Sequence, residues 1–358
     1  MREDSKREAA VNKILRTVAP GTVLREGIEN ILRAKTGGLI VVGATEAVLS
    51  ITDGGFPIQC DLTPSYIYEL AKMDGAIVIS DDLRKILYAN ANLNPDHSIQ
   101  TSETGTRHRT AERVAKQTGQ LVISISQRRN VITLYQGNFK YVLKDIGVIL
   151  TKANQAIQTL EKYKAVLDQA LTNLSALEFE DLVTLQEVTL VLQRFEMVLR
   201  IKSEIRRYIT ELGTEGRLIS MQLDELVSRV DEEAYLLVKD YGLMGPDQTP
   251  HQLLIQIHDL SSDELLDGAT LAKVLGYVSA NINDEPVSSR GYRVLNKIAR
   301  LPQPVIENLI ESFESLSNVL SASIEELDEV EGIGTVRARA IRDGLRRIQE
   351  QVFIDRHI

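Results

Sequence analysis

Short β-branched apolar runs, separated by helical patterns, dominate the chain up to about residue 146. Runs of this length, bounded by turn-forming residues, are typical of strands. One helix is expected from Thr63-Pro64 to about Lys72, since Thr is a good N-cap and Pro suits the first helical position. A second is expected over Thr106–Thr118, ended by Gly119. Strands interleaved with helices predict an α/β domain. The predicted strands are Leu39–Val42, Ala76–Ile79, Lys85–Tyr88, Leu121–Ile125 and Val131–Tyr135.

A helical pattern replaces these runs between about residues 144 and 241, a stretch without proline. Apolar residues recur at helical spacing in two series, Ile157–Leu171 and Val188–Ile205. Gly213 interrupts the pattern. A third helix is expected to follow and to end near Tyr241, before a break at Gly245-Pro246-Asp247. The pattern predicts a bundle or spine of long helices, followed by short helices to about residue 284.

From about Pro286 the chain consists of short helical patterns separated by turns. The most informative stretch is Val330–Ile341, in which the glycines of V-E-G-I-G-T-V-R-A-R-A-I separate two helical patterns. A related hairpin is expected around Leu301–Ile306. These three sequence patterns predict domains at residues 1–146, 147–285 and 286–358.

The composition is that of an acidic globular protein, with 358 residues, a formal net charge of −9 and a pI near 5.3. This charge excludes a bulk polyanion binder, so any nucleic-acid contact must come from a local basic patch or from backbone amides. The single cysteine, Cys60, excludes an intramolecular disulfide and fits a reducing cytoplasm. No signal peptide is expected, and no stretch approaches the roughly 18 apolar residues that span a bilayer. We therefore expect a cytoplasmic protein.

The segment Gly105–Thr110, G-T-R-H-R-T, leads directly into the second predicted helix. Free N–H groups and the dipole at a helix amino end attract anions, and arginine can grip phosphate oxygens with two hydrogen bonds. The glycine lets the backbone approach closely, and the threonine hydroxyls can complete a cradle for a triphosphate. The alternative is a basic surface helix start that is paired with Glu103 or Glu112.

A second candidate site is Asp74-Gly75-Ala76, where the first predicted helix meets a strand. A carboxylate held there can reach a metal ion or accept a proton from a hydroxyl. Taken alone, Asp-Gly is more often a simple turn. Taken with Gly105–Thr110, it predicts phosphoryl or nucleotidyl transfer, which needs a metal that neutralises charge and donors for the departing pyrophosphate.

Asp74-Gly75-Ala76 and Arg107-His108-Arg109 together resemble the two hallmark motifs of the diadenylate cyclase family. The flanking segments L-A-K-M and T-A-E-R-V-A-K-Q-T-G agree with this resemblance. The domain order resembles that of the DNA integrity scanning members of the family, over essentially the whole chain. The resemblance implies an α/β cyclase domain with a mixed sheet flanked by helices, an all-α helical spine and a C-terminal helix-hairpin-helix domain. It also implies that two ATP molecules are joined into cyclic di-AMP with release of two pyrophosphates, using Mg²⁺ or Mn²⁺.

The resemblance further implies roles for single residues. Asp74 would bind the metal near the attacking 3′-hydroxyl, and it would form the catalytic set with Arg107, His108 and Arg109. For His108 we expect a phosphate donor, with a general acid as the alternative. The implied nucleotide-binding set is Gly75, Ala76, Leu93, Thr106, Arg107, His108, Arg109 and Thr110.

Arg128 and Arg129 are added from their position after the strand Leu121–Ile125, as further phosphate contacts. The alternative for this pair is a solvated basic turn. Metal choice stays open between Mg²⁺ and Mn²⁺, because one carboxylate plus substrate phosphates accepts either ion.

The reaction constrains the assembly, because each ATP must offer its 3′-hydroxyl to the α-phosphate of the other. The simplest catalyst has two identical half-sites that meet face to face, so a lone subunit is expected to be inactive. The resemblance implies an octamer of stacked tetramers, with the helical spine holding the subunits together.

The segment Gly332-Ile333-Gly334 resembles the turn of helix-hairpin-helix modules. Glycines there let the backbone present amides to a DNA phosphate, and Arg337 and Arg339 follow on the next helix. Six arginines and three acids between Gly332 and Ile358 make this end locally basic. Contacts of this kind read the DNA backbone, so sequence-independent binding is expected. The alternative is a small helical domain for protein contact. The predicted DNA-binding residues are Gly332, Ile333, Gly334, Arg337 and Arg339.

Three functions fit these modules. The leading hypothesis is a diadenylate cyclase that is inhibited by branched or damaged DNA and associates with the nucleoid through that DNA. The second is a scaffold that binds DNA structures and holds ATP without turnover. The third, a nucleotidyltransferase acting on DNA ends, lacks both the lysine motif of a ligase and the spaced carboxylates of a polymerase.

Overall fold

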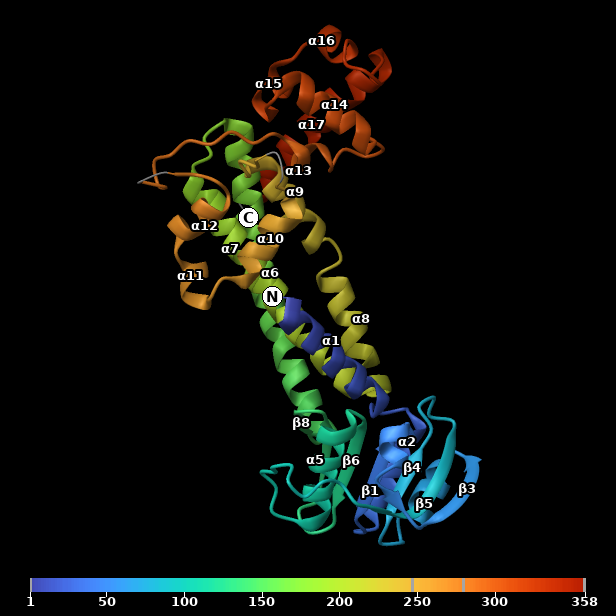
Figure 1. Ribbon diagram of the computed structural model, residues 1–358. Helices are drawn as coiled ribbons and strands as arrows, with labels where there is room; N and C mark the ends of the chain where they lie inside the picture. Colours follow the sequence, from blue (N-terminus) through green and yellow to red (C-terminus); the bar gives the residue numbers. More distant parts are fainter. Residues whose placement is uncertain (1, 246–247, 279–280, 357–358) are drawn as a thin grey trace. The chain divides into compact units, whose positions relative to one another are not determined.

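The computed structural model describes residues 2–245, 248–278 and 281–356. The chain divides into two compact units. One contains residues 1–154 and 206–220, and the other contains residues 155–205 and 221–358. The strands all belong to the first unit, whereas the second is helical (Figure 1). Among the described residues, no helix is both long and apolar enough to cross a lipid bilayer.

An eight-stranded mixed sheet forms the centre of the first unit. The strand order is β2-β5-β4-β1-β6-β7-β8, and β3 also pairs with β5. β1 and β4 are parallel, with Ile40 opposite Ile77, and the other pairs of named strands are antiparallel. This arrangement confirms the expected α/β fold. The strands are β1 (Gly38–Val42), β2 (Thr52–Asp53), β3 (Phe56–Asp61), β4 (Ala76–Ile79), β5 (Lys85–Leu93), β6 (Leu121–Ser126), β7 (Val131–Gln136) and β8 (Phe139–Val142).

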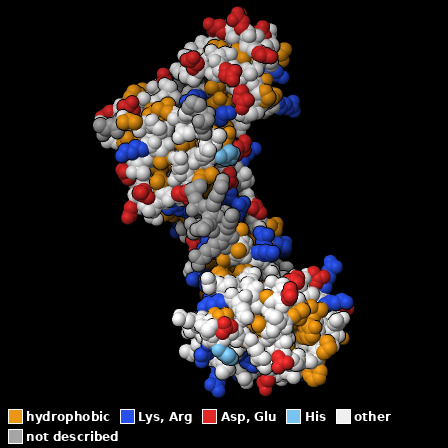
Figure 2. Space-filling model, in the orientation of Figure 1, with side chains coloured by type: hydrophobic (Ala, Val, Ile, Leu, Met, Phe, Trp, Pro, Cys, Tyr) orange, Lys and Arg blue, Asp and Glu red, His pale blue; other side chains and the backbone are white. Residues whose placement is uncertain are grey.

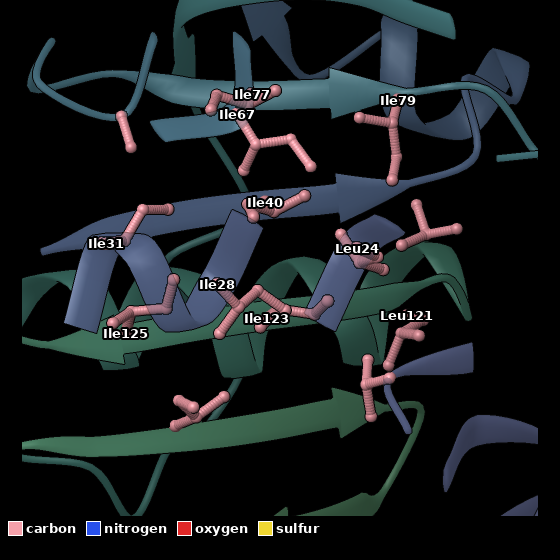
Figure 3. Packing of buried hydrophobic residues seen from close by; sticks show 14 of the residues in the cluster. Leu24, Ile28, Ile31, Ile40, Ile67, Ile77, Ile79, Leu121, Ile123 and Ile125 are labelled. Carbon is pink, nitrogen blue, oxygen red and sulfur yellow. The ribbon is translucent and has the colours of Figure 1, made fainter. Parts of the chain in front are cut away.

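Both faces of the sheet are covered, because alternate strand residues point to opposite sides. On one face, Leu24, Ile28 and Ile31 recur at helical spacing and pack with Ile40 and the other strand isoleucines (Figure 3). On the other face, a second cluster joins apolar residues of the strands to those of α5. The helices are α2 (Val23–Arg33) and α4 (Pro64–Leu70) on the first face, and α3 (Glu46–Leu49) and α5 (Thr106–Thr118) on the second.

All five predicted strands are confirmed, and α5 has the predicted bounds, with Gly119 in a left-handed conformation (φ 70°) at its end. The strand predicted over Lys85–Tyr88 extends to Leu93. α1 (Arg2–Thr17), α2, α3, β2, β3 and β8 were not predicted. β3 contains Pro57 and an irregular register to β5, which hides the alternation typical of a strand, and β8 has only four residues.

Two long helices, α6 (Ile146–Glu180) and α7 (Leu185–Leu212), account for the two apolar series. α7 ends before Gly213, because the φ of 52° at this residue is not helical. Only glycine fits there, since a Cβ would lie 2.3 Å from the Pro20 carbonyl oxygen. The expectation of one further helix to Tyr241 is wrong. The chain forms η1 (Gly213–Gly216), α8 (Arg217–Leu226) and α9 (Val230–Tyr241).

The physical reason for the break lies at the start of α9. Arg229 has a non-helical conformation (φ −124°, ψ 3°), and three acidic residues occupy the first turn of α9, where the helix dipole favours negative charge. The break expected at Gly245-Pro246-Asp247 lies partly outside the described residues, since Pro246 and Asp247 are not described. Short helices follow as expected: α10 (Pro250–Asp259), α11 (Ser262–Leu266) and α12 (Gly268–Val274).

The last part of the chain builds short helices around one apolar cluster. Pro302 is the N-cap of α14, at the position where the first hairpin was expected. The second hairpin joins α16 to α17 through residues 329–334. The helices are α13 (Tyr292–Leu295), α14 (Gln303–Phe313), α15 (Leu316–Ser321), α16 (Ile324–Asp328) and α17 (Thr335–Asp355).

Candidate functional site

α5 begins without a side-chain cap. Its N-cap residue is Gly105, whose carbonyl accepts from the Arg109 N–H at 2.8 Å. In contrast, Thr22 and Thr63 cap α2 and α4 by accepting hydrogen bonds from backbone N–H groups. The first three amides of α5 therefore have no competing side chain, and a helix amino end of this kind attracts an anion.

The side chains of the first turn of α5 divide into two groups. Thr106 and Arg109 are exposed, Arg107 and Thr110 are half-buried, and His108 is buried. Within the described part of the chain, neither arginine forms an ion pair. Two cationic side chains without a carboxylate partner thus flank a helix amino end, which is an arrangement suited to phosphate.

The two glutamates that might have neutralised these arginines have other partners. Glu103 forms an ion pair with Lys140, and Glu112 forms one with Lys116 at 2.8 Å. Glu112 also accepts hydrogen bonds from the Thr101 side chain and the Ser102 backbone, which holds the loop before α5 against the helix. The alternative of an internally paired basic surface is therefore not what the structure shows.

Gly37, just before β1, makes room for Arg107. A Cβ built on Gly37 would lie 1.9 Å from Nη1 of Arg107, so any side chain there would displace the guanidinium. β1 is parallel to β4, with Ile40 opposite Ile77. Gly37 directly precedes β1 and Asp74 lies two residues before β4, so both lie at the edge of the sheet where these two parallel strands begin. The topology thus brings the Asp74 and Arg107 segments to one edge.

Gly75 and Ala76 are constrained by packing. A Cβ on Gly75 would lie 2.3 Å from the Asn90 carbonyl carbon, and the Gly75 N–H donates to Asn90 Oδ1 at 3.1 Å. Ala76 and Leu93 are buried in the cluster on the α5 face. Asp74 itself is exposed. The close approach of β5 therefore explains why residue 75 is a glycine. The exposed Asp74 carboxylate remains available to bind a ligand.

Arg128 and Arg129 lie in the turn between β6 and β7. Nη2 of Arg129 donates to Oγ1 of Thr104 at 3.0 Å, so this arginine is tied to the loop directly before α5. Arg128 is exposed in the same turn. The structure thus brings Arg129 to the start of α5.

His108 points toward the sheet. Its Nδ1 lies 3.1 Å from Oη of Tyr135 on β7, and Tyr135 donates to Glu103 at 2.8 Å. Burial is the main cause that lowers the pKa of His108 below its ordinary value, and nearby Arg129 and Arg107 add to the effect while Glu103 opposes it. The imidazole is therefore neutral near pH 7.

A divalent cation fits this site only together with a nucleotide. Among the described residues, no group of three or more His, Cys, Asp or Glu side chains could hold a metal ion. Mg²⁺ commonly keeps several waters and binds through one or two carboxylates plus substrate phosphates. Asp74 is the carboxylate at this edge of the sheet that could supply such a contact.

Comparisons with known proteins identify the family of this chain. Residues 25–139 match the family model described as DisA bacterial checkpoint controller nucleotide-binding, and residues 143–283 match the model of the DisA bacterial checkpoint controller linker region. The DNA integrity scanning protein DisA of Carboxydothermus hydrogenoformans is 63% identical over 338 residues, covering 94% of this chain and 96% of that protein. The chain belongs to the DisA family. Its amino-terminal part is a diadenylate cyclase domain, so the protein is a nucleotidyltransferase.

Relatives from two bacilli span the chain equally well. The DisA proteins of Bacillus pumilus and Bacillus licheniformis are each 60% identical. The first alignment covers 98% of both chains, and the second covers 97% of both. The similarity to DisA therefore includes the segment after residue 283, which neither family model matches.

The segment of this DisA family member after residue 283 contains the hairpin between α16 and α17. Gly332 has a φ of 82°, which favours glycine, and Gly334 is an N-cap residue without a side-chain cap. Ile333 is buried in the apolar cluster, and its backbone N–H donates to the Val330 carbonyl at 3.0 Å. Arg337 and Arg339 are exposed, and Arg337 donates to the Gly332 carbonyl. The turn thus pairs open backbone amides with cationic side chains.

Charge is segregated within this hairpin. On the face seen in Figure 2, acidic side chains gather over the region of α15 and α16. α16 and the following turn carry five exposed acids, whereas residues 335–342 at the start of α17 carry three exposed arginines and no acid. The exposed acids of α17, which are Asp343, Glu350 and Asp355, lie farther along the helix. The acids of α16 and the turn are Glu325, Glu326, Asp328, Glu329 and Glu331.

Sequence reasoning missed three residues that lie near the start of α5, Gly37, Tyr135 and Lys140, and it missed the contacts of Glu103 with Tyr135 and Lys140. Gly37 had a local signal, since a Gly-Gly pair directly before a buried strand indicates close backbone approach. The other three carry no motif, because they come from β7, β8 and a loop that only the folded sheet brings to His108.

Proposed function

We propose that this protein condenses two ATP molecules into cyclic di-AMP and releases two pyrophosphates. The observation that carries the proposal is the meeting, at one sheet edge of a diadenylate cyclase domain, of the uncapped amino end of α5 with the Asp74 segment. Arg107 and Arg109 are free of ion pairs within the described residues. Such donors act where charge develops on the departing pyrophosphate.

Each side chain has a defined task in this proposal. Arg107, Arg109 and Arg129 hold the phosphates, together with the first amides of α5 and the hydroxyls of Thr106 and Thr110. Arg128, in the same turn as Arg129, is a further phosphate contact. Asp74 holds Mg²⁺ or Mn²⁺, which when bound neutralises charge on the phosphates. Gly75, Ala76 and Leu93 form the wall against which the nucleotide lies. His108 belongs to the same catalytic set.

The active form is a homo-oligomer. Each nucleotide attacks the other, so two copies of the site must face one another, and an isologous contact is the simplest way to achieve this. Holding both nucleotides in line then supplies most of the rate gain. The full assembly is proposed to be an octamer held by the helical spine of residues 147–285, between the cyclase domain of residues 1–146 and the DNA-binding domain of residues 286–358.

The carboxy-terminal hairpin binds DNA and regulates the cyclase. Support comes from the open turn at Gly332 and Gly334 and from the exposed arginines of α17. Branched or damaged DNA, such as a recombination intermediate, is the proposed ligand, and its binding inhibits cyclic di-AMP synthesis. The protein then works in the bacterial cytoplasm, at the nucleoid.

The first experiment identifies the product. The purified oligomer is incubated with ATP and either Mg²⁺ or Mn²⁺, and the products are separated and weighed by mass spectrometry. We expect cyclic di-AMP and pyrophosphate from the wild type and from Asp61→Asn, an exposed carboxylate at the end of β3. Asp74→Asn should lose turnover by about 10²-fold or more while still binding ATP. Intact ATP from a folded, oligomeric wild type would refute the proposal and favour a scaffold that holds ATP.

The second experiment tests regulation. Cyclase rates are measured with and without saturating four-way junction DNA, with linear duplex of equal length as the control. Inhibition by the junction is expected, and Arg337→Ala combined with Arg339→Ala should relieve it. Equal rates with and without junction DNA would remove the regulatory part of the proposal and leave the cyclase part untouched.

A further inference from the structure

A chain of polar side chains runs behind the first turn of α5 and ends at His108. Lys140 on β8 pairs with Glu103, which lies in the loop before the helix. Glu103 Oε1 lies 2.8 Å from Oη of Tyr135 on β7, and Tyr135 Oη lies 3.1 Å from Nδ1 of His108. Two strands and one loop therefore contribute to a chain of contacts that ends at the His108 ring.

The direction of each hydrogen bond in this chain follows from its charged end. Burial raises the pKa of Glu103, but the hydrogen bonds from Lys140 and Tyr135 outweigh it, and the net pKa lies below the ordinary value. Glu103 is thus a carboxylate, which only accepts. Tyr135 must use its one proton on Glu103, because burial and this carboxylate raise its pKa well above the ordinary range.

The tautomer of His108 is then determined. The Tyr135 oxygen has given its proton to Glu103, so toward the ring it can only accept, and Nδ1 of His108 must carry the hydrogen. In a neutral imidazole the other nitrogen has no hydrogen and is an acceptor. Nε2 of His108 is buried and has no hydrogen-bond partner in the described structure. A nitrogen in this state cannot donate to a phosphate oxygen.

We propose that Glu103 and Tyr135 are positioning residues of the cyclase, which lock His108 as the Nδ1–H tautomer and thereby anchor the first turn of α5. His108 is held between α5 and the sheet, while the arginines on either side of it remain available. The orientation of the Arg107 and Arg109 side chains toward the phosphates therefore depends on the hydrogen bond between His108 and Tyr135, on the opposite side of the helix turn. The motif thus contains two phosphate ligands, Arg107 and Arg109, and one anchor. His108 serves the catalytic set by positioning these arginines and does not itself donate to a phosphate.

This inference rests on the proposed cyclase reaction, but its decisive readout does not. Histidine labelled with ¹⁵N is incorporated into the whole protein, which contains five histidines, and His108 is assigned by its absence from the His108→Asn spectrum. We expect Nδ1 to resonate as a protonated nitrogen and Nε2 as an unprotonated one. A protonated Nε2 on a neutral ring would overturn the proposal whether or not the wild type makes cyclic di-AMP.

A matched pair of substitutions separates anchor from phosphate donor. Asparagine places its amide near the position of Nδ1, whereas glutamine reaches the position of Nε2. We expect His108→Asn to be at least about tenfold more active than His108→Gln, since misplacing the reacting groups by about 1 Å can cost about 10²-fold. The reverse order of activities would contradict an anchoring role. Thermal melts of both variants exclude a simple loss of folding.

Tyr135→Phe tests the chain itself, with Tyr141→Phe as the control. Tyr141 forms the same kind of pair, a 2.6 Å hydrogen bond to Glu211 in the same unit, and it packs against the apolar cluster on the sheet face opposite α5. Loss of the Tyr135 hydroxyl should lower kcat by about 10- to 100-fold with a smaller change in the Kd for ATP, because alignment rather than contact is lost. Tyr141→Phe should leave kcat unchanged. Equal effects of the two variants would reduce the chain to a structural element and refute the inference.

Discussion

The helices α5 and α17 begin in the same way, each after a glycine N-cap without a side-chain cap and each with two arginines among its first five residues. On its sheet side, α5 is supported by the polar contacts that run from His108 through Tyr135 and Glu103 to Lys140. Gly37 leaves the space that Arg107 occupies. α17 instead turns an apolar stripe inward and leaves all of its arginines exposed along its length.

The difference concerns the surroundings of the helix end, and not its sequence motif. At α5 the helix start is held through His108 on β7 and through Arg107 beside Gly37, which suits a ligand of fixed size whose charge must be met at defined points. At α17 the arginines are exposed, and only contacts within the hairpin and the helix hold Arg337 and Arg346, which suits a phosphate backbone read at variable positions. Each of the following substitutions tests one side of this comparison and uses the other side as an internal control.

The largest effect is expected when Arg107 is replaced by alanine. A preorganised donor is lost from the site, so kcat/KM for the cyclase should fall by about 10²- to 10³-fold. DNA affinity, measured by fluorescence anisotropy, should not change. Arg84→Ala is the control, because Arg84 is exposed on the same unit. A loss no greater than that of the control would mean that Arg107 is not held for the phosphates.

A smaller and salt-dependent effect is expected from Arg337→Ala combined with Arg339→Ala. Each lost phosphate contact should make the slope of log K against log salt concentration shallower by about 0.9. Cyclase activity without DNA should be unchanged. The matched control replaces Arg346 and Arg347, which are exposed farther along the same helix. An equal change of slope in both double variants would show that α17 binds along its whole length and not through the turn.

The smallest effects are expected from two serine substitutions that cap these helix ends. A Cβ on Gly105 or Gly334 would have no neighbour closer than 3.9 Å and 4.0 Å, respectively, so a serine fits. Its hydroxyl would accept an N–H that the ligand otherwise uses, and ligand affinity should fall roughly two- to fivefold without loss of thermal stability. Gly105→Ser should weaken only ATP binding, and Gly334→Ser only DNA binding. An effect on both ligands from either variant would argue against two separate phosphate sites.

Much of the α/β domain was predictable, because its signals are local. The five strands, the bounds of α5 and its stop at Gly119 follow from β-branched runs, helical spacing and glycine conformation. The split between α8 and α9 was not predicted, although the acidic first turn of α9 is a local signal for a new helix start. β3 was missed because Pro57 and an irregular register obscure its pattern.

Buried polar groups were the least predictable features. Arg293 is fully buried and pairs with Glu178, 115 residues away in the sequence. Asp240 accepts from the backbone N–H groups of Gly291, Tyr292 and Arg293, and its burial, with Glu178 nearby, raises its pKa to about 7. Neither the spacing nor the composition marks these residues, since a charged side chain in a helical pattern is normally solvated.

The sequence by itself determined which functional groups are present: a carboxylate at Asp74, two arginines at a helix amino end, and a glycine turn before a basic helix. Those properties depend on residue type and on neighbours a few positions away. Only the tertiary structure decided which of them meet. The parallel pairing of β1 with β4 brings Asp74 to the edge where Gly37 receives Arg107, and the pairing of β7 and β8 brings Tyr135 and Lys140 to His108 and Glu103. Strand pairing and burial join residues far apart in the chain, and such contacts leave no periodic trace in the sequence.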